Sequence, residues 1–353
     1  MSEWQNVKLG EIVTLHYGKA LRAQDRIEGD IPVYSSAGIT GYHNVPLVMS
    51  KGIIIGRKGT VGKVYYSEKP FCCIDTAYYI LPNESKYDFI WLYYQLGTIG
   101  LEELNEDSAV PGLNRETAYS QEILLPTISE QKAIASILLS LDNKIHLLHR
   151  QNKILEDMAE TLFRQWFIEE AEDDWEDVEL GELFSICSGK GLKRNEIVDS
   201  GLYPVLGANG EIGRCNHAMF SERLIYTGRV GTLGKIFVIN ENEKVWLSDN
   251  TLIFRDIKYY YFVYFQLKSI DFNEYNVGSN QPLIRQSDIK KILVNIPHQL
   301  KKIDDFERYS EVIFNKKNFN IQKIQTLEKL RDTLLPKLMS GEVRVKYTPE
   351  AEQ

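Results

Sequence analysis

The chain repeats itself at a nearly constant spacing of 171 to 172 residues. The segment WQNVKLGE that begins at Trp4 returns as WEDVELGE beginning at Trp175, and GRKGTVGK at 56–63 returns as GRVGTLGK at 228–235. Solenoid repeats have periods of roughly 20–50 residues, whereas this period is the size of a domain with a connecting element. The sequence therefore predicts a duplicated chain whose two halves fold alike and are related by an approximate twofold axis.

Composition places the chain among ordinary globular proteins. Its 353 residues are 43% apolar, which is enough for two or more domains, and no run of 18 apolar residues is present. The first residues lack the basic and apolar regions of a signal peptide, so we expect a cytoplasmic protein without membrane contact. The four cysteines form no CxxC pair, which favours reduced thiols over a zinc site or disulfides.

Each half changes in composition and in apolar periodicity near a proline, Pro126 or Pro297. The part before it is rich in glycine, tyrosine and β-branched residues with many turn signals, which predicts a β-rich domain. The part after it has a seven-residue apolar period, which predicts one long helix. We therefore expect an α+β chain with five segments: a domain at 1–128, a helix at 129–170, a domain at 171–297, a helix at 298–343 and a tail at 344–353.

The two expected helices carry apolar residues in lines spaced by seven. The lines are Ile134, Leu141, Leu148, Leu155 and Leu162 in the first helix, and Phe306, Ile313, Leu327 and Leu334 in the second. This period is typical of a coiled coil, and we expect the two helices to pack antiparallel. Ser129 is the expected N-cap of the first helix, and Met158 is expected to extend its apolar stripe. Asn152 and Asn320 interrupt the stripes; either they fix register within the seam or that stretch is exposed.

With these motifs the chain resembles the specificity subunit of type I restriction-modification systems over about residues 4–343. The resemblance is carried by the repeated W-x-x-V-x-L-G-E and G-R-x-G-T-x-G-K segments, by P-x-x-x-E-Q-K-x-I at 126–134, and by LLPKLMSGE at 334–342. It implies two target recognition domains that each read one half of a bipartite, asymmetric site on double-stranded DNA. It also implies that the two helices dock two methyltransferase subunits, which restriction subunits then join. The second helix entry, PHQLKKI at 297–303, lacks the Ser-Glu-Gln of the first, so we expect unequal docking surfaces.

Basic residues of the glycine-rich segments, and of the cluster that follows the first strand of each domain, are the expected DNA contacts. They are Lys19, Arg22, Arg57, Lys58 and Lys63 in the first domain, and Lys190, Lys193, Arg194, Arg229 and Lys235 in the second. Lysine and arginine can hold phosphates or reach guanine edges, although solvated surface charge is the commoner role. The glycine-rich segments have the wrong spacing for a nucleotide-binding P-loop, and we expect Gly59 and Gly62 to form a hairpin turn. Because the net charge is −8, DNA binding is expected to depend on local patches or on a basic partner.

No catalytic constellation stands out. The chain has no Asn/Asp-Pro-Pro-Tyr/Phe tetrapeptide, which the resemblance would require of an adenine methyltransferase, and no glycine-rich fingerprint for a nucleoside cofactor. We therefore predict a non-enzymatic chain without catalytic residues, cofactors or metal ligands. Two alternatives stay open: a degenerate nuclease or methyltransferase, and a coiled-coil scaffold or silent recognition cassette that does not read DNA.

Overall fold

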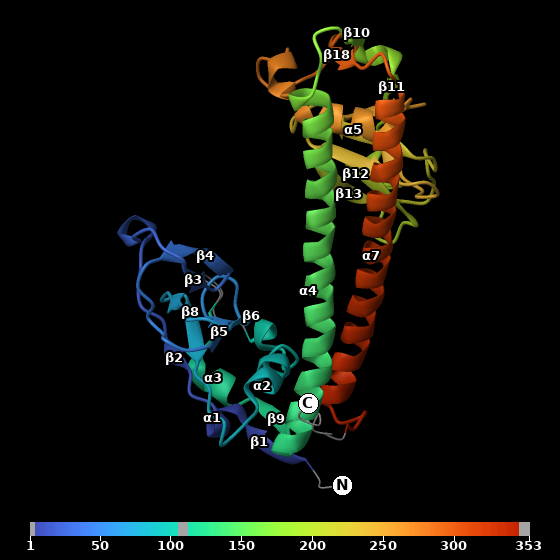
Figure 1. Cartoon of the computed structure of the whole chain (residues 1–353). Coiled ribbons are helices and arrows are strands. Elements are labelled where there is room, and N and C mark those ends of the chain that lie inside the picture. The colour runs from blue at the N-terminus through green and yellow to red at the C-terminus, as the bar shows by residue number, and fades with distance from the viewer. Residues whose placement is uncertain (1–3, 105–111, 346–353) are drawn as a thin grey trace, which may run out of the picture. The chain divides into compact units, whose positions relative to one another are not determined.

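The computed structural model describes residues 4–104 and 112–345, and these form two compact units (Figure 1). One unit comprises the described residues up to Leu148 together with those from Gln322 onward, and the other comprises His149–Ile321. Each unit thus contains one β-rich domain and one end of each of two long helices, α4 (Ile128–Arg164) and α7 (Lys301–Met339). The expected tail at 344–353 lies outside the described residues from position 346 on.

The first unit opens and closes its domain with a strand pair, β1 with β9, whose register joins Gln5 to Leu125. A four-stranded sheet has the order β2-β8-β5-β6, and a three-stranded sheet has the order β4-β3-β7 with β3 and β7 parallel. The elements of this domain are β1 (Gln5–Lys8), α1 (Leu9–Ile12), β2 (His16–Tyr17), η1 (Ala23–Asp25), β3 (Ile31–Ser35), β4 (Gly38–His43), β5 (Gly52–Gly56), β6 (Val64–Ser67), β7 (Cys72–Cys73), β8 (Ala77–Ile80), α2 (Phe89–Leu96), η2 (Leu101–Glu103), α3 (Arg115–Tyr119) and β9 (Glu122–Leu125).

The second unit repeats this topology strand for strand. Its sheets have the orders β11-β17-β14-β15 and β13-β12-β16, and β10 pairs with β18 as β1 pairs with β9. The elements are η3 (Gln165–Glu169, a π-helical turn), β10 (Glu176–Glu179), η4 (Leu180–Glu182), β11 (Ser185–Ser188), η5 (Arg194–Glu196), β12 (Tyr203–Gly207), β13 (Gly210–Cys215), β14 (Leu224–Gly228), β15 (Ile236–Ile239), β16 (Trp246–Leu247), β17 (Thr251–Arg255), α5 (Tyr260–Ser269), η6 (Phe272–Tyr275), α6 (Gln286–Lys290) and β18 (Leu293–Ile296). The predicted α+β class and the duplication are confirmed.

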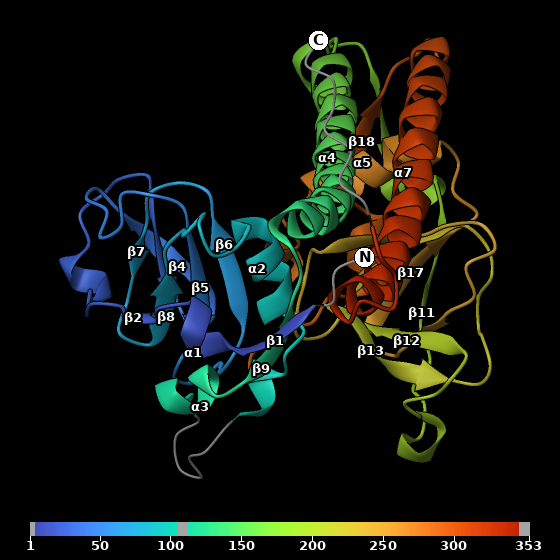
Figure 2. The same cartoon turned by 90° about the horizontal axis from the view of Figure 1, so that it is seen from below.

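An apolar helix joins each four-stranded sheet to the long helices. In the first unit α2 lies beside β6 (Figure 2). Its Trp91 and Leu92 belong to one core with Ile53 of β5 and with Ile134 and Leu138 of α4. In the second unit α5 does the same, since Phe262 and Phe265 pack against Phe163 of α4 and Phe306 of α7. Burial of these aromatic side chains is the main force that attaches each domain to its helices.

Within each unit the two long helices pack on one another. In the first unit Ile145 and Leu148 of α4 meet Ile324 and Leu327 of α7 in a small apolar cluster. The nine residues of the seven-residue lines are all buried or half-buried: Ile134, Leu141, Leu148, Leu155, Leu162, Phe306, Ile313, Leu327 and Leu334. Met158 is 55% exposed, so the prediction that it extends the stripe is wrong; Ala159, one residue further, is fully buried in its place.

The two asparagines lie inside the seam rather than on an exposed stretch. Asn152 and Asn320 are 8% and 0% exposed, and the Asn320 amide nitrogen donates to Asn152 Oδ1 and to Gln151 Oε1, each at 2.9 Å. Asn320 Oδ1 is buried and has no hydrogen-bond partner among the described residues. An amide pair of this kind fixes register because any shift would bury both amides unpaired.

Replacing one asparagine is expected to cost more than replacing both. Asn320→Leu leaves the Asn152 amide buried without its donor, which lowers the free energy of unfolding by about 1–3 kcal/mol. The double variant Asn152→Leu/Asn320→Leu removes both polar groups and is expected to be nearly neutral or more stable than the parent. Urea unfolding of the three proteins checks this; a double variant that is as unstable as the single one would contradict it.

The start of α4 differs from the sequence-based expectation. The helix begins at Ile128, and the Thr127 hydroxyl accepts the Glu130 amide at 3.4 Å, so Thr127 rather than Ser129 caps it. Glu130 accepts from the Trp4 indole and pairs with Arg344, and Gln131 bonds the Pro126 carbonyl and the Asp88 amide. Both side chains are buried. The Ser-Glu-Gln segment therefore anchors the helix to its own domain, and the expectation that the two helix entries form unequal docking surfaces stays a prediction.

Candidate nucleic-acid interface

The glycine-rich segment of each unit is a tight connection between two antiparallel strands. Residues 56–63 join β5 to β6, and residues 228–235 join β14 to β15. Gly59 and Gly62 have φ of 81° and 73°, and their counterparts Gly231 and Gly234 have 85° and 78°. These angles lie in the left-handed region that only glycine adopts at little cost. The predicted turn is confirmed, and it is the same in both units.

The two glycines of the first turn are expected to differ in their tolerance of alanine. A Cβ on Gly59 would meet only Ser36 Oγ, at 3.7 Å, so Gly59→Ala costs about 1 kcal/mol for the left-handed backbone alone. A Cβ on Gly62 would lie 2.2 Å from the carbonyl carbon of Leu101, so η2 has to move as well. Thermal unfolding of Gly62→Ala should show a loss several times that of Gly59→Ala, and equal losses would contradict this account.

Around each turn, four further loops converge into what we call the loop cluster. In the first unit it comprises residues 17–19, 35–38, 56–63, 73–77 and 112–115. The Arg57 amide donates to the Thr76 carbonyl at 2.9 Å, and the Leu113 amide donates to the Arg57 carbonyl at 2.8 Å. The Lys19 amide donates to the Cys73 carbonyl, and the Ser36 amide to the Thr76 hydroxyl. Asp75 and Thr76 thus form a structural turn.

The second unit builds its loop cluster from residues 188–190, 206–210, 228–235, 247–251 and 281–286. The Arg229 amide donates to the Asn250 carbonyl at 2.7 Å, and the Ile284 amide donates to the Arg229 carbonyl at 3.0 Å. The Lys190 amide donates to the Leu247 carbonyl at 2.9 Å. These three backbone hydrogen bonds have the same partners, by position, as those of Arg57, Leu113 and Lys19 in the first unit, while the side chains on this frame are free to differ.

Most of the cationic candidates are exposed and lie on or beside the loop clusters. The exposed ones are Lys19, Arg22, Lys58, Lys63, Lys190, Lys193, Arg194 and Lys235. Lys19, Lys58, Lys63, Lys190 and Lys235 belong to the loop clusters themselves, whereas Arg22, Lys193 and Arg194 lie at the short helical turns η1 and η5. Lys63 Nζ lies 5.9 Å from the Tyr65 ring, and Lys235 Nζ lies 5.0 Å from the Phe237 ring and 3.3 Å from Asn209 Oδ1.

The two arginines of the turns, Arg57 and Arg229, are half-buried and already partly engaged. Arg57 stacks on the Tyr17 ring with 4.9 Å between the guanidinium carbon and the ring centroid, and its Nη1 donates to the Asp75 carbonyl at 3.1 Å. Arg229 Nη1 donates to Ser188 Oγ at 3.1 Å, while its Nε is buried without a partner among the described residues. These side chains are thereby held in place rather than free to swing as the exposed lysines are.

Sequence reasoning missed one residue in each loop cluster, Arg115 and Gln286. Arg115 begins α3 and stacks on Tyr17 at 5.3 Å, beside Arg57. Gln286 begins α6 and donates through Nε2 to Ser188 Oγ at 2.8 Å, beside Arg229. The two positions are 171 residues apart, as are Tyr17 and Ser188, so the duplication itself was the signal that could have found them.

The described residues offer no evident site for a metal ion or a reactive thiol. Across residues 4–104 and 112–345, no three His, Cys, Asp or Glu side chains are grouped so as to hold a metal ion. All four cysteines are free, and burial, with the neighbouring Cys72, raises the pKa of the Cys73 thiol to about 12, which keeps it protonated. Within the same residues, no helix is both long enough and apolar enough to span a bilayer.

Comparison with known proteins converges on one family. The family model for the type I restriction modification DNA specificity domain matches residues 1–157 and again 172–329. The type I restriction enzyme MjaIX specificity subunit of Methanocaldococcus jannaschii is 27% identical, over 84% of this chain and 79% of its own length. The MjaVIII specificity subunit of the same organism is 22% identical over 98% and 94%. The crystal structure of the S subunit of a type I restriction-modification system from M. genitalium superposes with a TM-score of 0.67 at 19% identity, over 95% and 96% of the two chains.

Proposed function

The chain belongs to the type I restriction-modification DNA specificity family, and we propose that each of its two domains reads one half of a bipartite, asymmetric DNA target. Specificity subunits in such systems are non-catalytic and confer sequence choice on partner enzymes, and this is the function of the chain. The observation that carries the finer proposal is the loop cluster, which has one backbone frame and two different sets of side chains. A common frame positions both domains on the duplex alike, and different side chains then select different bases.

The exposed cations of the loop clusters are the proposed phosphate contacts. Lys19, Lys58 and Lys63 in one unit, and Lys190 and Lys235 in the other, carry charge on loops that a stable sheet supports. Phosphate contacts of this kind contribute affinity that falls with salt and does not depend on sequence. Each lysine replaced by glutamine should therefore reduce the slope of log affinity against log salt by about one, without changing the motif.

The family implies DNA and the other subunits of the system as partners, and we propose that two methyltransferase subunits dock on this chain. The long helices offer exposed apolar side chains for such contacts, among them Leu147, Ile154, Val312 and Phe319. A chain with net charge −8 is disfavoured on DNA, so basic surface supplied by the methyltransferase is expected to raise its affinity strongly. Restriction subunits would join through that complex, and the cytoplasm is the proposed location because the target is cellular DNA.

The deciding experiment is a single-molecule methylome of cells that carry a cognate type I methyltransferase, with and without this chain. We expect a new bipartite adenine-methylated motif, with unlike halves, only when the chain is present. A palindromic motif would contradict the asymmetric reading. If no motif appears although the chain co-purifies with the methyltransferase, the chain is a scaffold or a silent cassette instead.

A further inference from the structure

The loop cluster of the first unit holds two guanidinium groups against one exposed ring. Tyr17 is 47% exposed, and the guanidinium carbons of Arg57 and Arg115 lie 4.9 and 5.3 Å from its centroid. Stacking on the ring favours both cations, but two like charges this close repel one another. Arg115 forms an ion pair with Glu116, whose Oε1 is 3.7 Å from Arg115 Nε. No carboxylate among the described residues pairs with Arg57. The two guanidinium groups thus present donors whose one carboxylate partner among the described residues is the exposed Glu116.

The same three positions in the second unit hold a different set of groups. Ser188 replaces the tyrosine, Arg229 is retained, and Gln286 replaces the second arginine. Arg229 Nη1 and Gln286 Nε2 both donate to Ser188 Oγ, at 3.1 and 2.8 Å. A hydroxyl oxygen has two lone pairs, and these two donors occupy both lone pairs of Ser188 Oγ. The Ser188 hydroxyl hydrogen must therefore be donated to a different group. Fixing the Gln286 amide nitrogen also fixes its carbonyl oxygen as an acceptor.

The two sets therefore differ in hydrogen-bonding character. The two arginines of the first unit, Arg57 and Arg115, offer only donors, whereas Arg229 and Gln286 of the second offer donors together with the Gln286 carbonyl as acceptor. In the major groove, guanine presents two acceptors, O6 and N7, which an arginine fork matches. Adenine presents the N7 acceptor beside the N6 donor, which an amide side chain matches.

We propose that positions 115 and 286 are specificity-determining: Arg115 selects a guanine in the half-site of the first domain, and Gln286 selects an adenine in the half-site of the second. This inference rests on the proposed function, and it names the two contacts that make the halves of the target differ. Tyr17 with Arg57, and Ser188 with Arg229, act as positioning residues that fix the orientation of the reading side chain. Such support is what separates a base-reading side chain from a mobile surface cation.

The test is an exchange of the two reading residues, scored by the methylome of the intact complex with its methyltransferase. Arg115→Gln is expected to change or relax one guanine position in one half-site, with a loss of discrimination of about 5- to 150-fold at that position. Gln286→Arg is expected to act on one adenine position of the other half-site. The matched control is Lys63→Gln, which should lower occupancy at all sites equally and leave the motif unchanged.

The outcomes separate this inference from the function on which it rests. If the parent chain yields a bipartite motif but Arg115→Gln leaves both halves unchanged, the reading role is wrong while the function stands. Uniform loss of methylation with a lower salt slope would make Arg115 a phosphate contact and would also overturn the proposal. Co-purification with the methyltransferase and an unaltered circular dichroism spectrum exclude misfolding. Arg115→Lys, which keeps the charge but loses the fork, should relax the same position.

Discussion

Exchanging residues 171–297 for the corresponding domain of another specificity subunit is expected to replace one half of the methylated motif and leave the other half intact. The expected effect is all-or-none: methylation moves from one set of genomic sites to another. The reason is that the start and the end of the domain pair with each other. Strand β10 pairs antiparallel with β18, in a register that runs from Glu176↔Ile296 to Glu179↔Leu293. Its sheets also have their own apolar clusters, which include Leu224, Ile253 and Leu247.

The boundaries and the helix contact decide whether the graft folds. A shorter exchange of residues 185–297 would separate β10 from its native partner β18 and should unfold the domain. Phe262 and Phe265 must be kept in the graft, because they pack on Phe163 and Phe306 of the long helices. The matched control is the reciprocal exchange of residues 1–128, which should alter the other half only. A single exchange that altered both halves of the motif would refute independent reading by the two domains.

Much of this architecture could be predicted because short stretches of sequence determine it. The strands around Ile53–Ile55 and Leu224–Tyr226, the turn glycines and the two long helices each follow from short-range periodicity or backbone requirements. The wrong predictions concern positions where two neighbouring residues fit the sequence pattern equally well. Ser129 and Thr127 both suit an N-cap, and Met158 and Ala159 are neighbours on a helix whose exact rotation only packing determines.

The reading positions could not be found in the same way because they are assembled by tertiary structure. Tyr17, Arg57 and Arg115 come from three separate loops, and neither their spacing nor their residue types form a motif. The buried polar side chains at the start of α4 have the same origin. Nothing in the sequence indicates that the Glu130 carboxylate is bound by Trp4 and Arg344. Long-range partners of this kind are visible only once the sheet and helices have brought them together.

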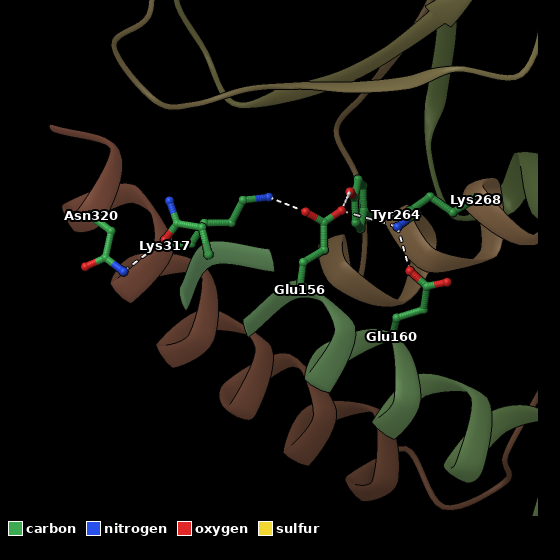
Figure 3. Close-up of polar contacts among 7 residues, drawn as sticks. Glu156, Glu160, Tyr264, Lys268, Lys317 and Asn320 are labelled. Atoms are coloured by element: carbon green, nitrogen blue, oxygen red, sulfur yellow. Dashed lines mark hydrogen bonds and ion pairs between the residues drawn. The ribbon is translucent and has the colours of Figure 1, made fainter. Parts of the chain in front are cut away.

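Removing the Glu156 carboxylate is expected to lower the stability of the second unit strongly. Its oxygens bind Lys317 of α7 at 2.5 Å, and Lys268 and Tyr264 of α5 at 3.3 and 3.2 Å (Figure 3). One acid on α4 therefore ties together both elements that pack on it. Glu156→Ala leaves two lysines half-buried without this partner, and we expect a loss of about 3 kcal/mol in the free energy of unfolding. Glu160→Ala is the control: it also contacts Lys268, but it is more exposed and should cost under about 1 kcal/mol.

The stabilisation that Glu156 provides is expected to decrease as the pH falls. Burial raises the pKa of the Glu156 carboxyl, but the hydrogen bonds and charges of Lys317 and Lys268 outweigh it, so the pKa lies below its ordinary value of 4.5. A carboxyl whose pKa is lowered by folding stabilises the protein above its unfolded-state pKa, and that contribution is lost as pH falls through the folded-state pKa. The stability difference between the parent and Glu156→Gln should thus be full at pH 7 and shrink below pH 4.5. Urea unfolding at pH 7 and below pH 4.5 measures this stability difference, and hydrogen exchange of the α5 amides locates the effect in the structure. A difference that is independent of pH would mean that Glu156 acts through packing alone, and not through the ion pairs that connect α5 and α7 to α4.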